Sequence, residues 1–164
     1  MRHLSLYFVV ILLFACRYSN SKRFSAISKL PDFEIVSMLD TLGHVWPDKL
    51  PAACPIIFMY FDPECDHCQE ETKQIVKHAA DLAGTKIFMI AHTSYSSLVK
   101  FYQEFGLRKM QNLVVGNDTD MSFYRCFVPS AVPFIAIYNK KKELVKIYLG
   151  QTDIASIIRS TRDL

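Results

Sequence analysis

The sequence lacks the patterns that are typical of repeat proteins, of nucleic-acid-binding proteins and of structural zinc sites. No internal repeat and no low-complexity tract occurs in its 164 residues. The formal net charge is +3, lysines and arginines are spread along the chain, and no basic run alternates with aromatic residues, so nucleic acid is not a favoured partner. Neither a second CxxC motif nor a close pair of histidines is present, which argues against a closed structural zinc site with four ligands.

The first apolar stretch, residues 4–15, is too short to cross a membrane as a helix. It has about a dozen residues, whereas a spanning helix needs about 20. Because Arg2 gives the chain a basic start, the pattern is typical of a secretory signal peptide. The stretch leads into LFAC at 13–16, which resembles the lipobox of bacterial lipoproteins. We therefore expect a lipoprotein-type signal peptide at residues 1–15 and lipidation of Cys16, with plain secretion as the alternative.

Residues 16–29 are polar and basic, show no apolar period, and are expected to form a tether. The remaining residues, 30–164, number about 135, which is enough for one domain with a sizeable core and too few for two. The protein is therefore expected to be exported, to face the periplasm, and to be held on a bacterial membrane by a lipid on Cys16.

Apolar patterns at strand spacing and at helix spacing alternate along residues 30–164. Continuous apolar runs predict buried strands, and apolar residues three and four positions apart predict helices. The predicted strands lie at 56–61, 86–91, 112–118, 133–139 and 143–150, and the predicted helices at 68–84, 94–107, 121–127 and 152–161. A hairpin at 32–50 is expected to cover one edge. This order predicts an α/β fold with a central mixed sheet flanked by helices and an extra N-terminal β-hairpin.

Cys65 and Cys68 form a CxxC motif where the first buried strand passes into a helix. Unpaired N–H groups and the positive end of the helix dipole favour a thiolate at Cys65, whereas Cys68 lies one turn further in. Cys65 is therefore expected to attack a disulfide, and Cys68 to resolve the mixed disulfide. A bridge across so short a loop removes little entropy from the unfolded chain, so a reactive role is favoured over a structural one. Cys54 and Cys126 are expected to be packed residues.

Charged neighbours are expected to tune this pair. The imidazole of His67 can stabilise the adjacent thiolate, whereas Asp66 and the acids before it disfavour a second negative charge. The direction of electron transfer therefore stays open. Glu71 lies three residues beyond Cys68, at the edge of the apolar face of the predicted helix. It is a candidate general base for Cys68, and a solvated acid in the first helical turn is the alternative reading.

Three stretches of the sequence together resemble a known family. They are FMYFDPECDHCQEE at 58–71, SAVPFIAIYN at 130–139 and KIYLGQ at 146–151. Their order resembles that of exported thioredoxin-like thiol-disulfide oxidoreductases, especially the TlpA-like and ResA-like group. A CxxC motif alone is weak, but its position after a buried strand and ahead of a proline-led strand makes the resemblance specific.

The resemblance implies a thioredoxin fold for residues 30–164, with Cys65 and Cys68 as the redox pair. It also implies a cis Pro133 facing that pair across the substrate groove, and a functional acid at Glu71. Substrates would be protein thiols and disulfides, no cofactor would be bound, and a membrane electron relay or another redox partner would be needed. The dipeptide between the cysteines differs from the Gly-Pro of thioredoxin, so reduction, oxidation and isomerisation all stay open.

Three other functions also stay open. A copper-binding or metallochaperone domain of the same fold would use Cys65 and Cys68, with His67 or His92 as further ligands. A peroxiredoxin-like antioxidant would share the fold, although the residues before Cys65 lack the proline and threonine pattern of that family. The third alternative is a non-catalytic binding module anchored to a membrane.

Overall fold

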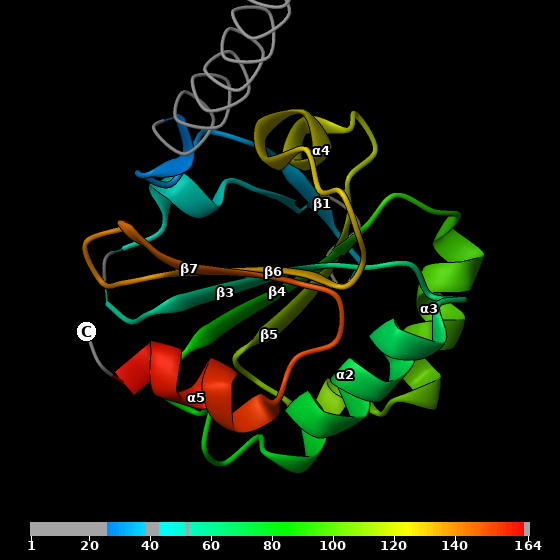
Figure 1. Ribbon diagram of the computed structural model, residues 1–164. Helices are drawn as coiled ribbons and strands as arrows, with labels where there is room; N and C mark the ends of the chain where they lie inside the picture. The colour runs from blue at the N-terminus through cyan, green and yellow to red at the C-terminus, as the bar shows by residue number, and fades with distance from the viewer. Residues whose placement is uncertain (1–25, 39–42, 52, 163–164) are drawn as a thin grey trace, which may run out of the picture.

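The computed structural model describes residues 26–38, 43–51 and 53–162 (Figure 1). The expected signal peptide at 1–15, Cys16 and most of the expected tether lie outside these residues. The described part forms one seven-stranded sheet with helices on both faces (Figure 1). This architecture confirms the α/β class, the mixed central sheet and the N-terminal hairpin that the sequence predicted.

The order of the strands in the sheet differs from their order along the chain. The strands are β1 (Ile35–Ser37), β2 (His44–Val45), β3 (Ile56–Tyr60), β4 (Lys86–Ala91), β5 (Leu113–Asn117), β6 (Phe134–Tyr138) and β7 (Leu144–Leu149). The helices are α2 (Asp66–Lys77), α3 (Tyr95–Glu104), α4 (Ser122–Phe127) and α5 (Ile154–Arg162), with 3₁₀ helices η1 (Pro47–Lys49) and η2 (Leu107–Lys109). The order in the sheet is β2-β1-β5-β4-β3-β6-β7. β3, β4 and β5 run parallel, and the remaining neighbours are antiparallel.

β3 has a central position, parallel to β4 and antiparallel to β6. Its five residues are all buried, as predicted for a strand covered on both faces. Its side chains alternate between two cores. Ile57 and Met59 pack in the core beneath α2, α3 and α5, whereas Phe58 and Tyr60 pack in an aromatic core beneath α4. The chain therefore leaves β3 between two layers of helices and passes directly into the CxxC motif.

α4 is a short helix whose start is held by a buried carboxylate. Asp118 is 0% exposed, and it accepts hydrogen bonds of 3.0 Å from the main-chain N–H groups of Phe123 and Tyr124. These bonds satisfy two of the unpaired donors at the helix N-terminus. The ring of Phe123 stacks on that of Tyr60 with centroids 5.2 Å apart. The helix is thereby fixed against the sheet beside the carboxyl end of β3.

α2 ends earlier than the sequence predicted. The predicted helix extended to residue 84, but α2 ends at Lys77, and the chain continues in turns. The N–H of Leu82 donates to the carbonyls of His78 and Ala79 at 3.3 and 3.2 Å. These tighter turns bring the side chain of Leu82, which is 0% exposed, into the core. Burying a leucine contributes about 1.5–3 kcal/mol, which outweighs the helix propensity of the alanine-rich segment.

Residues 27–29, the end of the expected tether, contact the sheet. Ile27 is 6% exposed and packs in the aromatic core. Its carbonyl accepts a hydrogen bond of 2.8 Å from the hydroxyl of Tyr138, and the N–H of Leu144 donates to the carbonyl of Ser28 at 2.9 Å. The last residues of the expected tether are therefore docked against β6 and β7.

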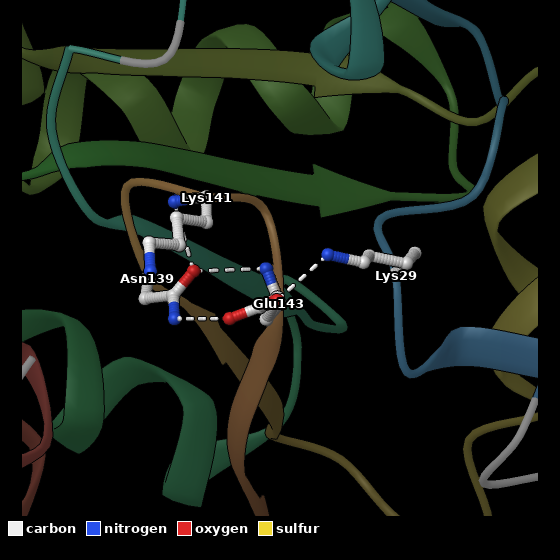
Figure 2. Close-up of polar contacts among 4 residues, drawn as sticks. All are labelled: Lys29, Asn139, Lys141 and Glu143. Carbon is white, nitrogen blue, oxygen red and sulfur yellow. Dashed lines mark hydrogen bonds and ion pairs between the residues drawn. The ribbon is translucent and has the colours of Figure 1, made fainter.

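A polar network joins the β6–β7 turn to the N-terminal segment (Figure 2). The side-chain oxygen of Asn139 accepts the N–H groups of Lys141 and Glu143, each at 2.9 Å. The carboxylate of Glu143 accepts from Asn139 at 3.1 Å and from the ammonium of Lys29 at 2.7 Å. Because β6 is antiparallel to β3, this turn lies at the end of the sheet opposite the CxxC motif. The described chain therefore starts far from that motif.

Gly116 in β5 is expected to tolerate no side chain. A Cβ at this position would lie 2.1 Å from Cγ2 of Ile35 and 3.1 Å from the carbonyl oxygen of Val36 in β1. Gly116→Ala should therefore lower the free energy of unfolding by about 1–3 kcal/mol, because overpacking displaces β1. Urea unfolding measures this loss. In the matched control, Gly84→Ala, nothing lies within 4 Å of the added Cβ, and equal stability of the two variants would contradict the prediction.

Candidate active site

The CxxC motif begins in the loop that connects β3 to α2. Cys65 is the N-cap residue of α2, with φ −83° and ψ 118°. Local hydrogen bonds fix the loop, since the N–H of Cys65 donates to the carbonyl of Asp62 at 3.1 Å and the N–H of Glu64 donates to the Asp62 carboxylate at 2.9 Å. Cys65 thus lies at the positive end of the helix dipole, beside the unpaired N–H groups of the first turn.

The two sulfur atoms of the motif differ in exposure. Cys65 is partly exposed and Cys68 is 0% exposed, and both are free thiols that lie near each other. The pKa of the Cys68 thiol is raised to about 12, mainly by burial and also by Cys65, whereas a hydrogen bond from the main chain of Asp62 lowers it. Cys68 is therefore protonated at neutral pH, and it needs a base before it can attack.

Glu71 is buried beside the start of α5. Its side chain is 0% exposed, so the reading of Glu71 as a solvated acid is wrong. Its Oε2 accepts a hydrogen bond of 2.7 Å from the main-chain N–H of Thr152, and its Oε1 has no partner among the described residues. Burial raises the pKa of Glu71, the Thr152 bond lowers it, and the charge of Asp153 raises it. A carboxylate held in this way is suited to accept a proton.

Glu71→Gln is expected to stabilise the protein at neutral and alkaline pH. Because the pKa of Glu71 is raised in the folded protein, the folded state binds this proton more tightly than the unfolded state, and stability falls as pH rises through the folded-state pKa. Removing the buried charge should therefore add about 1–3 kcal/mol at pH 8 and little at pH 4. Thermal unfolding of both proteins at both pH values measures this difference. An equal gain at the two pH values, or a loss at pH 8, would contradict the prediction.

Pro133 lies beside the carboxyl end of β3. The Val132–Pro133 peptide bond is cis, as the resemblance implied. In the register of the two strands, Tyr60 of β3 is opposite Phe134 of β6, so Pro133 is level with the first residue after β3. The carbonyl of Pro133 accepts a hydrogen bond of 2.8 Å from the N–H of Gly150. The proline is therefore next to the loop from which the CxxC motif starts.

The two residues between the cysteines face solvent. Asp66 and His67 are both exposed, and Nδ1 of His67 is 3.1 Å from the side-chain oxygen of Gln151. Neither Gln151 nor Thr152 was predicted as a site residue, although both contact predicted site residues. The available signal was the short GQT segment at 150–152, where a predicted strand meets a predicted helix.

The described residues do not bring together a metal site. Among residues 26–38, 43–51 and 53–162, no three His, Cys, Asp or Glu side chains are grouped so as to hold a metal ion. Nδ1 of His92 instead lies 2.9 Å from the carbonyl of Asp118. Cys54 and Cys126 are only partly buried.

In the described part of the chain, no helix combines the length and the apolar character needed to span a bilayer.

Comparison with known proteins gave similarity at the level of structure. No protein-family model and no curated protein matches the sequence. DsbF of Mycobacterium tuberculosis has a TM-score of 0.69 at 15% identity, covering 84% of this chain and 96% of that chain. A secreted M. tuberculosis disulfide oxidoreductase homologous to E. coli DsbE has a TM-score of 0.68 at 15% identity, covering 85% and 98%. A peroxiredoxin-like protein from Aquifex aeolicus has a TM-score of 0.67 at 12% identity, covering 83% and 85%.

The chain has a thioredoxin fold. This confirms the fold that the resemblance implied. At such low identities, the likeness establishes the fold alone, and thioredoxin-fold proteins carry out both disulfide exchange and peroxide reduction. The chemistry must therefore be inferred from Cys65, Cys68 and the groups around them.

Proposed function

We propose that the protein is a thiol-disulfide oxidoreductase that exchanges electrons with protein thiols and disulfides through Cys65 and Cys68. One observation carries the proposal: a partly exposed thiol at the N-terminus of α2 lies near a buried free thiol one turn further along. Such a pair can form a disulfide inside the site and open it again. The similarity to a secreted disulfide oxidoreductase supports the proposal.

The exchange proceeds in two steps that balance in atoms and electrons. In the reducing direction, the Cys65 thiolate attacks a substrate disulfide, a Cys65–substrate disulfide forms, and one substrate sulfur leaves as a thiolate. Glu71 takes the proton of Cys68, whose thiolate attacks the sulfur of Cys65. The second substrate thiolate leaves, so the substrate gains two electrons and the pair becomes a disulfide. The reverse steps oxidise a substrate dithiol, and neither direction needs a bound cofactor.

The neighbouring residues set the balance between these directions. A positively charged imidazolium at His67 would stabilise the Cys65 thiolate, whereas the negative carboxylate of Asp66 would destabilise that thiolate. Pro133, level with the start of the CxxC loop, borders the groove in which the substrate chain approaches Cys65.

We also propose that the protein is exported and is anchored to a bacterial membrane by a lipid on Cys16. Support comes from the signal-like start and the LFAC motif of the sequence. Further support comes from the docking of Lys29 to Glu143 at the end of the sheet opposite Cys65 (Figure 2), since an anchor at that end leaves the redox pair open to partners. Substrate proteins and a membrane electron relay or another redox partner are the proposed partners. Incorporation of labelled lipid that is lost in Cys16→Ser tests the anchor.

Reduction of insulin by dithiothreitol, with and without the full-length protein, tests the proposed reaction. Acceleration of insulin precipitation is the expected result, because the Cys65 thiolate would attack the insulin disulfides faster than the free dithiol does. The same protein is tested with hydrogen peroxide, because one similar structure is peroxiredoxin-like. Consumption of peroxide without reduction of insulin would contradict the proposal and favour a peroxidase.

A further inference from the structure

The loop between β7 and α5, residues 150–152, contacts parts of the site that come from other elements. The N–H of Gly150 donates to the carbonyl of Pro133 at 2.8 Å. Gly150 has a φ of 75°, a conformation that glycine adopts without strain. The hydroxyl of Thr152 donates back to the carbonyl of Gly150 at 3.2 Å. The loop is therefore fixed to the proline side of the site by its own main chain.

Two further contacts join the same loop to α2. The side-chain oxygen of Gln151 accepts from Nδ1 of His67 at 3.1 Å, and the main-chain N–H of Thr152 donates to Oε2 of Glu71 at 2.7 Å. The second contact is short, as hydrogen bonds to carboxylates are. Its acceptor is fully buried, since Glu71 is 0% exposed, and its donor is partly buried. The loop therefore holds one oxygen of a buried carboxylate and leaves Oε1 without a partner among the described residues.

We propose that Thr152 is a positioning residue for the proton transfer that activates Cys68. This inference rests on the proposed function. The N–H of Thr152 fixes Glu71 so that Oε1 takes the proton of the Cys68 thiol, directly or through one water molecule, while Oε2 stays bound. Cys68 and Glu71 are three positions apart in α2, which places them on the same face of the helix, one turn apart. A buried carboxylate oxygen without a partner is costly in free energy, and a proton-accepting role accounts for it.

The charges around Glu71 make its bond to Thr152 important. Asp153 from the same loop and Glu70 from the same helix are both negative, and both disfavour ionisation of Glu71. The arginines of α5 are engaged elsewhere, with Arg159 bonded to Ser156 and Arg162 bonded to Asp81. The N–H of Thr152 is therefore the group that favours the carboxylate form against burial and two negative neighbours.

The matched pair Thr152→Pro and Thr152→Ala tests this inference, because proline removes the N–H and alanine keeps it. Reduced full-length protein is mixed in a stopped-flow instrument with less than one equivalent of dithiobis(nitrobenzoate). The first coloured thiolate is released when Cys65 attacks, and the second is released when Cys68 closes the disulfide. The rate of the second release is measured across pH, since it depends on ionisation of Glu71. Circular dichroism shows whether Thr152→Pro is folded. If it is not, a main-chain ester at 152 removes the N–H instead.

Loss of the N–H is expected to move the pH midpoint of the second release upward by about 1–2 pH units. The sign follows because the lost bond favours the ionised form, so the carboxylate of Glu71 appears only at higher pH. The first release should not change, and Thr152→Ala should keep the wild-type midpoint. Equal midpoints in the N–H-deleted protein and in Thr152→Ala would overturn the inference while leaving the proposed function intact. Absence of a second release from the wild-type protein would overturn both.

Discussion

Cys68→Ser is expected to convert the protein into a trap for its substrates. With serine at this position Cys65 still attacks a disulfide, but no second thiol is left to break the Cys65–substrate bond. The release step should slow by roughly a thousandfold or more, because its nucleophile is gone. The Cys68 side chain is 0% exposed, and serine differs from it by one atom, so the fold should persist. Electrophoresis without reductant and mass spectrometry should then show substrate bonded to Cys65.

Two serine substitutions elsewhere provide matched controls for this trap. Cys54 precedes β3, and Cys126 lies on α4 with its sulfur 3.9 Å from the carbonyl oxygen of Asp32. Neither should be needed for release, so Cys54→Ser and Cys126→Ser should turn over like the wild-type protein. Accumulation of the same adduct in either control, or an adduct that maps to Cys126 in the Cys68→Ser protein, would contradict the assigned roles.

Cys65→Ser is expected to abolish exchange rather than to trap an intermediate. The thiol that remains, Cys68, is 0% exposed and has a pKa raised to about 12. Burial, the largest cause of the raised pKa, persists in the variant, so the Cys68 thiol stays protonated at pH 7 and shielded from a protein substrate. The protein's own contribution to insulin reduction should therefore fall by roughly a thousandfold or more, which leaves the rate of dithiothreitol alone.

The stability of the Cys65→Ser protein separates lost chemistry from lost structure. Cys65 is partly exposed, so serine there should change the free energy of unfolding by no more than about 0.5 kcal/mol. Urea unfolding of the reduced proteins measures this difference. Substantial activity in a folded Cys65→Ser protein would mean that another thiol attacks, and that the placement at the start of α2 is not what makes a cysteine reactive here.

Strands were the part of the fold that the sequence predicted well. β3 and β4 are continuous apolar runs that are buried on both faces, and such runs have few other structural solutions. The end of α2 was predicted too late because local periodicity continued to residue 84, whereas Leu82 turns into the core through tertiary packing. The burial of Ile27 within the expected tether was not predicted either, since its carbonyl accepts a hydrogen bond from Tyr138, 111 positions away.

The candidate site also has a part that a local sequence motif predicted and a part that depends on tertiary contacts. The pair Cys65 and Cys68 could be predicted because both lie within one local motif at a strand-to-helix junction. The bond from Thr152 to Glu71 could not, since it spans 81 positions and its donor is a main-chain N–H that every residue except proline carries. The burial of Glu71 likewise depends on where α5 packs against α2. Groups supplied by the main chain leave no pattern in the sequence.

A redox titration of the full-length protein tests the central claim most directly. The protein is equilibrated with mixtures of reduced and oxidised glutathione, its free thiols are blocked, and its peptides are examined by mass spectrometry. Cys65 and Cys68 should pass together from two blocked thiols to one disulfide, in a single two-electron transition, while Cys54 and Cys126 stay blocked. If no mixture joins Cys65 to Cys68, or if either pairs with a different cysteine, the protein does not use these two residues as a redox pair.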